Sequence, residues 1–190
     1  VLDVLAHLQR VALALPRRIE HAQLLAPQDI PRFASRGVTA SVQPVHATQD
    51  MAKVDRGGGE RGRYAYPFAS LLASGAQLAF GSDSPVETMD PIAGIHAAVT
   101  RRTADRLPEA GWYPEERIAL AAALAAYTAG CARAIAEDGT LGRIASGYWG
   151  DFVVLSEDLF ALDDPVGIAR TQVDLTIVAG EIVYSRRPDE

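Results

Sequence analysis

Short apolar segments alternate with segments of helical periodicity along most of the chain, and this alternation constrains the fold more than any other feature. After a helical segment at residues 1–15, strands are predicted at residues 18–23, 38–43 and 76–80, and helices at residues 27–35, 66–74 and 91–102. Strands separated by helices pair in parallel, because the chain has to cross over the sheet between them. The pattern therefore predicts an α/β fold built on a parallel sheet.

The remaining segments complete the predicted architecture. The polar stretch after Pro44 contains three consecutive glycines and is expected to be a loop, whereas residues 114–126 are expected to form one helix. Beyond Gly139, glycines recur at short intervals and the segments between them are rich in β-forming residues. Strands are expected at residues 151–156, 174–180 and 181–185, and the last two are expected to form an antiparallel hairpin. We therefore predict two domains, residues 1–138 and residues 139–190.

Composition excludes several classes of protein. The chain has 18 Lys and Arg against 24 Asp and Glu, a net charge of −6, and nonspecific nucleic-acid binding requires a basic surface. Its one cysteine, Cys131, excludes an internal disulfide framework and a cysteine-rich zinc module. No apolar stretch reaches membrane-spanning length, and the N-terminus lacks the basic region and cleavage site of a signal peptide. We expect a cytoplasmic protein that binds neither nucleic acid nor membrane.

Three polar side chains follow the predicted parallel strands. His21 ends the first strand, His46 lies just past the second, and Asp83 follows the third in a Gly-Ser-Asp-Ser-Pro turn. The carboxyl ends of parallel strands meet at one rim, where α/β enzymes place their active sites. Imidazole and carboxylate are ligands that suit zinc and similar divalent ions. The positions of these three residues therefore predict that they share one site able to bind a metal ion.

Each of these residues also has a purely structural interpretation. A single histidine at a strand end is commonly a hydrogen-bonded structural residue, and an aspartate in such a turn commonly bonds its own backbone. No residues that bind an organic cofactor are expected beside them. The prediction of a site depends on the three groups occurring at successive strand ends.

Long stretches of the chain resemble the amidohydrolase superfamily, specifically the YtcJ-like (amidohydrolase 3) branch of metal-dependent hydrolases. The most specific is the GSDSPV–DP–GI–AAVTR string, and the resemblance extends in order over residues 18–50, 64–101, 127–155 and 173–184. It implies a TIM-like (β/α)8 barrel with a small β-sandwich assembled from both chain ends. It also implies hydrolysis of C–N bonds in amide-like small molecules, with one or two divalent ions, expected to be zinc.

The resemblance implies a role for each candidate residue. His21 matches the metal-ligand histidine at the end of barrel strand six. Asp83 matches the aspartate after strand eight, which binds metal and acts as general base toward the attacking water. His46 matches the histidine after strand seven, which is expected to contact the substrate or transition state. The expected metal ligands are thus His21 and Asp83, and the expected catalytic residues are Asp83 and His46.

Several parts of the family pattern do not occur in this sequence. The paired His-x-His of strand one, the bridging ligand of strand four and the histidine of strand five are all missing. The chain therefore resembles only the C-terminal portion of a family member, with strands six to eight. We expect it to be inactive alone, to bind metal weakly, and to associate with itself or with a missing N-terminal half. The alternative is a truncated, non-catalytic fragment that only assembles or binds a small molecule.

Overall fold

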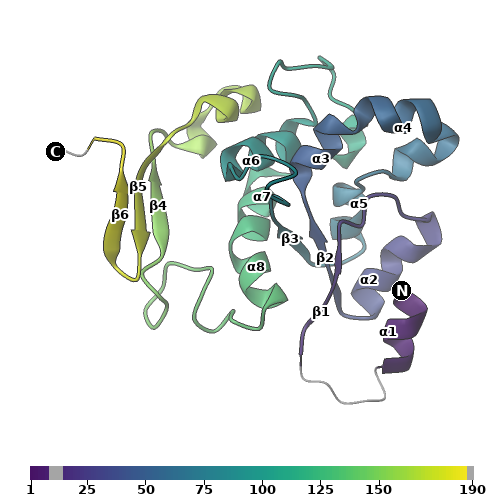
Figure 1. Cartoon of the computed structure of the whole chain (residues 1–190), viewed down its shortest axis with the longest axis horizontal. Helices are drawn as coiled ribbons and strands as arrows, with labels where there is room; N and C mark the ends of the chain where they lie inside the picture. Colours follow the sequence, from purple (N-terminus) through teal and green to yellow (C-terminus); the bar gives the residue numbers. More distant parts are fainter. Residues whose placement is uncertain (9–14, 188–190) are drawn as a thin grey trace.

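The computed structural model of the chain describes residues 1–8 and 15–187, which form two three-stranded sheets (Figure 1). The first sheet is parallel, has the order β1-β2-β3, and is surrounded by helices. The second is antiparallel, has the order β4-β5-β6, and lies at the C-terminal end of the molecule. The prediction of a parallel α/β sheet followed by a small antiparallel sheet is confirmed.

The parallel sheet consists of β1 (Arg17–Glu20), β2 (Val38–Val42) and β3 (Leu78–Phe80). Its register aligns Ile19 with Ala40, and Ala40 with Leu78, so the carboxyl ends of all three strands lie at one edge. β2 is central and almost entirely buried, as expected of a strand rich in Val, Thr and Ala between two neighbours. Among the described residues, β1 and β3 each pair with β2 only.

Helices follow the strands as the alternating pattern predicts. They are α1 (Leu2–Leu8), the 3-10 turn η1 (Pro27–Asp29), α2 (Ile30–Ser35), α5 (Phe68–Ala73), α6 (Pro91–Thr100), α7 (Leu120–Tyr127) and α8 (Ala129–Ala134). The rest of the predicted first helix, residues 9–14, lies outside the described residues. α2 packs on β2, and α5, α7 and α8 pack on β3.

The core is formed where these helices meet the sheet. Phe33, Phe68, Leu71, Val38 and Val42 are among its completely buried side chains. Burial of side chains of this size stabilises a fold by about 1.5–3 kcal/mol each. The core therefore holds β2 and its flanking helices together behind the edge where the strands end.

The expected loop after Pro44 is instead mostly helical. It contains α3 (Pro44–Gln49), α4 (Met51–Gly57) and the 3-10 segment η2 (Gly59–Tyr64). Proline ends a strand because it cannot donate to the next ladder bond, but its fixed φ also suits the first position of a helix. Pro44 occupies that position in α3, so it ends β2 and begins a helix at once.

The helix predicted at residues 114–126 is divided. Pro114–Glu116 forms the separate 3-10 turn η3, and α7 begins only at Leu120. The buried carboxylate of Glu116 accepts hydrogen bonds from the backbone N–H and the hydroxyl of Ser70. This contact with a distant segment replaces the first turns of the predicted helix.

The C-terminal sheet consists of β4 (Phe152–Leu155), β5 (Val173–Val178) and β6 (Glu181–Ser185), with η4 (Leu159–Ala161) and η5 (Pro165–Arg170) between β4 and β5. β5 and β6 form the predicted antiparallel hairpin. The domain boundary near residue 138 stays a prediction.

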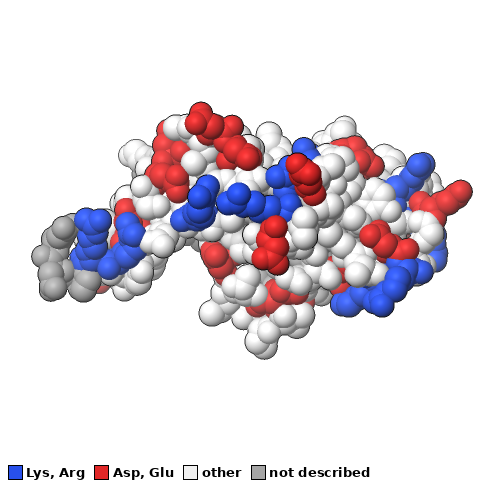
Figure 2. Space-filling view, turned by 90° about the horizontal axis from the view of Figure 1, so that it is seen from above, with Lys and Arg blue, Asp and Glu red and all other residues white. Residues whose placement is uncertain are grey.

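The surface carries both signs of charge. On the face seen in Figure 2, basic and acidic side chains alternate between uncharged areas. Among the described helices, none combines the length and apolar character needed to cross a membrane.

Candidate metal centre

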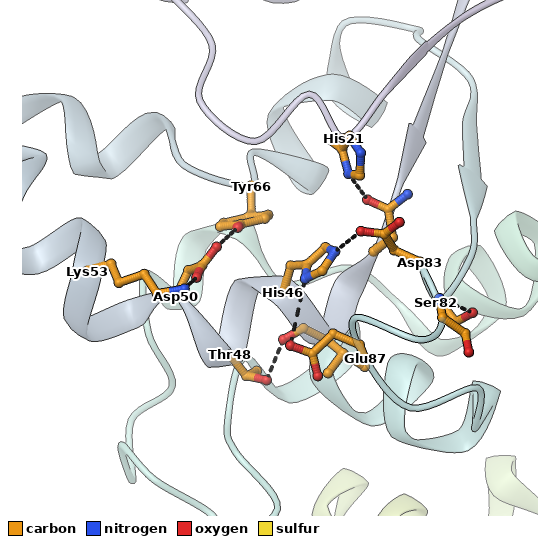
Figure 3. A network of polar contacts seen from close by, with 12 residues as sticks. His21, His46, Thr48, Asp50, Lys53, Tyr66, Ser82, Asp83 and Glu87 are labelled. Carbon is orange, nitrogen blue, oxygen red and sulfur yellow. Dashed lines mark hydrogen bonds and ion pairs between the residues drawn. The ribbon is translucent and has the colours of Figure 1, made fainter.

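His21, His46 and Asp83 meet beyond the carboxyl ends of the parallel strands (Figure 3). His21 directly follows β1, His46 lies in the first turn of α3 after β2, and Asp83 lies three residues past β3. One potential ligand atom from each residue falls within 4.8 Å of the others. The structure therefore brings together all three residues that the sequence singles out.

The backbone is left-handed at two of these positions. φ is 69° at His21 and 60° at Asp83, and Ala22 has φ 42°. Positive φ is uncommon for residues other than glycine and costs free energy that the surrounding structure has to supply. At His21 a hydrogen bond of 2.7 Å from its backbone N–H to the carbonyl of Ser41 in β2 helps to hold the turn.

His46 lies between two carboxylates. Its Nε2 is 3.2 Å from Oδ2 of Asp83, and its Nδ1 is 3.8 Å from Oε1 of Glu87. The histidine is buried, whereas the side chain of Asp83 is 35% exposed and that of Glu87 20%. Asp83 can therefore be reached from solvent while it contacts His46.

His21 has a different partner. Its Nδ1 lies 2.9 Å from Oε1 of Gln43, the residue between β2 and α3. The rings of His21 and His46 are tilted by 49° to each other, with their centroids 6.0 Å apart. Each histidine thus has one hydrogen-bond partner that limits its rotation.

Tyr66 links the segments that follow the two histidines. Its backbone N–H donates to the carbonyl of Gln23 at 2.7 Å, and its hydroxyl donates to the carboxylate of Asp50. The N–H of Asp50 in turn donates to the carbonyl of His46 at 2.9 Å and closes α3. Tyr66 therefore couples the turn after His21 to the helix that bears His46.

Asp50 is ionised within this network. Partial burial opposes its ionisation, but hydrogen bonds from Lys53 and Tyr66 outweigh burial and hold the pKa of the Asp50 carboxyl below its usual value. Burial, together with the bond to Asp50, raises the pKa of the Tyr66 hydroxyl. The phenol therefore stays protonated and acts as a donor.

The completely buried guanidinium of Arg101 holds the backbone of Tyr66 through a hydrogen bond. Arg101 directly follows α6 and donates to the carbonyls of Trp112 at 2.9 Å and Tyr66 at 3.0 Å, and more weakly to that of Ala65 at 3.5 Å. It also lies over the rings of Phe68 and Trp112. Burial lowers the pKa of Arg101 to about 10, so the side chain is still a cation at neutral pH.

The sequence did not identify four contributors to this region, namely Gln43, Glu87, Tyr66 and Arg101. Gln43 and Glu87 carry a weak signal, because each lies within four residues of a predicted site residue and has a polar side chain. Tyr66 and Arg101 lie far from all three site residues along the chain, and only the folded structure connects them.

The donor set fits a divalent cation. Two imidazoles and one carboxylate are ligands typical of zinc, and catalytic zinc sites commonly use three protein ligands with one open position. The partial exposure of Asp83 leaves room for such an open position. The three groups thus have a chemistry that suits a divalent metal ion.

A family model described as the amidohydrolase family matches residues 1–184. Over 170 residues the chain is 35% identical to a protein described as the putative amidohydrolase YtcJ of Bacillus subtilis (strain 168), an alignment that covers 89% of this chain and 32% of that protein. The chain thus spans about a third of the length of this relative.

Solved structures also resemble the chain. An uncharacterised metal-dependent hydrolase from Pyrococcus furiosus is 31% identical, with a TM-score of 0.63 over 77% of this chain and 29% of that one. An adenosine deaminase from Xanthomonas campestris with bound zinc is 23% identical, with a TM-score of 0.63 over 96% of this chain and 40% of that one. The second likeness shows the mixed α/β fold alone.

Proposed function

Because the chain belongs to the amidohydrolase family, we propose that it is the C-terminal part of a metal-dependent hydrolase that cleaves C–N bonds in amide-like small molecules. β1, β2 and β3 would be strands six to eight of a TIM-like barrel, and β4, β5 and β6 part of its β-sandwich. One observation carries the proposal: the potential ligand atoms of His21, His46 and Asp83 lie within 4.8 Å of one another at the strand ends.

His21 and Asp83 would hold the metal, which is expected to be zinc, as in the zinc-bound structural neighbour. When bound, such an ion activates water and polarises the substrate carbonyl. Asp83 would accept the proton of the attacking water on a carboxylate oxygen and deliver it to the leaving nitrogen. Its contact with His46 and its partial exposure support this role.

His46 would contact the substrate or the transition state. Its ring is buried between Asp83 and Glu87, so its position is fixed before a substrate arrives. With its ring held in this position, His46 would hydrogen-bond the carbonyl oxygen as negative charge develops on it.

The site would be completed by another polypeptide segment. His21 and Asp83 supply two ligands, or three if His46 is recruited, whereas a tetrahedral zinc site takes about three or four protein ligands. In the described part of the chain β1 and β3 each have one unpaired edge, which favours pairing with further strands. We therefore propose self-association or association with an N-terminal half.

This proposal is tested by purifying the chain with and without a co-expressed N-terminal half of a YtcJ-like relative. We expect weak zinc retention by the chain alone and a zinc content close to one or two ions per complex, measured by elemental analysis. Light scattering on the same samples should show a self-associated chain or a complex of both halves. A folded monomer at micromolar concentration that retains no zinc under either condition would instead support the non-catalytic fragment.

A further inference from the structure

We propose that Gln43 is a positioning residue that fixes the tautomer of His21 and so prepares this histidine to bind a metal ion through Nε2. The part of this inference that concerns metal binding rests on the proposed function. The hydrogen bond itself is independent of any ion, since it joins two side chains of the chain.

Gln43 is held in place by its backbone and its burial. It directly follows the last residue of β2 and directly precedes Pro44, the first residue of α3, and it is only 6% exposed. His21 is anchored to the same strand by the bond from its N–H to Ser41. The two side chains therefore meet just beyond the ends of two paired strands, β1 and β2.

The chemistry of the contact determines where the ring proton lies. In the orientation of the amide found in the structure, Oε1 of Gln43 lies 2.9 Å from Nδ1 of His21. An amide oxygen can only accept a hydrogen bond, so in this orientation Nδ1 is the N–H donor. A neutral imidazole has one N–H and one lone pair, and the lone pair is then on Nε2. Metal ligation requires that lone pair, and histidine ligands characteristically donate their other ring N–H to an acceptor.

The opposite orientation of the amide gives the opposite result. With its NH2 group toward Nδ1, Gln43 would donate, the ring proton would move to Nε2, and that nitrogen would lose its ability to bind metal. The two arrangements differ in a property of His21 that can be measured without metal or substrate.

Nitrogen NMR of the metal-free chain at alkaline pH reads the tautomer of each histidine, and calorimetric titration with zinc then gives the affinity. We expect His21 to carry its proton on Nδ1. In Gln43→Met, which has similar length but no acceptor of this kind, we expect protonation at Nε2 to become populated and zinc affinity to fall about 10- to 100-fold. Gln43→Glu keeps an acceptor oxygen and should retain the Nδ1–H tautomer.

Gln49→Met is the matched control, because Gln49 is an exposed residue of α3, the helix that Gln43 directly precedes, and this change should alter neither property. An Nε2–H tautomer of His21 in the unsubstituted chain would overturn the proposal, as would unchanged or tighter zinc binding in a folded Gln43→Met chain. If no variant binds zinc while the tautomer depends on Gln43 as described, the metal proposal fails but the orienting contact stands.

Discussion

Asp83→Asn is expected to abolish hydrolysis in the complete enzyme while leaving the fold intact. The amide can neither accept the proton of the attacking water nor supply an anionic ligand. A general base alone contributes about 10²- to 10⁴-fold to a rate, so we expect kcat to fall at least that far. The loss is measured as product release by the zinc-loaded enzyme, with circular dichroism as the check on folding.

The fold should tolerate this substitution because Asp83 lies in a loop after β3 and is partly exposed. Asp105→Asn serves as the control, since it makes the same change at an exposed position that belongs to no part of the site. Turnover near that of the unsubstituted enzyme in Asp83→Asn would show that Asp83 is not the general base.

Arg101→Met is expected to cause the largest loss of stability. It removes the guanidinium that donates hydrogen bonds to the backbone carbonyls of Trp112 and Tyr66. An unsatisfied buried polar group costs about 1–3 kcal/mol, and relief from burying the charge offsets part of this. We expect the free energy of unfolding in urea to fall by about 2–4 kcal/mol.

This change should also disturb the positions of His21 and His46, because Tyr66 connects Arg101 to the segments that follow these two histidines. Zinc affinity is therefore expected to weaken even under conditions in which the variant remains folded. Arg170→Met, at an exposed position of η5, should leave both stability and zinc affinity unchanged. Equal stability of the Arg101 and Arg170 variants would contradict the supporting role of the guanidinium.

The convergence of His21, His46 and Asp83 was predictable because it depends on topology. Once alternating segments indicate a parallel sheet, residues that follow successive strands have to lie at one rim, whatever the details of packing. The helical conformation of residues 44–57 was not predictable in this way. Pro44 marks the end of a strand in sequence, and its second effect, the start of α3, depends on how the following residues pack.

Interactions between distant segments account for the features that sequence reasoning missed. In the sequence, Arg101 looks like a cation at a helix C-terminus, which is a common arrangement on protein surfaces. In the structure it is completely buried and donates to the carbonyls of Tyr66 and Trp112. Likewise Glu116 looks like an ordinary first-turn acid but bonds Ser70 and divides a predicted helix. No local pattern distinguishes these roles from the ordinary ones.

Anomalous X-ray diffraction at the zinc edge, from zinc-loaded crystals of the chain or its complex with an N-terminal half, tests the central claim most directly. A zinc peak about 2.0–2.2 Å from both an imidazole nitrogen of His21 and a carboxylate oxygen of Asp83 is the expected result. A zinc ion bound only elsewhere in the structure, or a zinc-loaded crystal with no anomalous peak beside these two residues, would contradict the account.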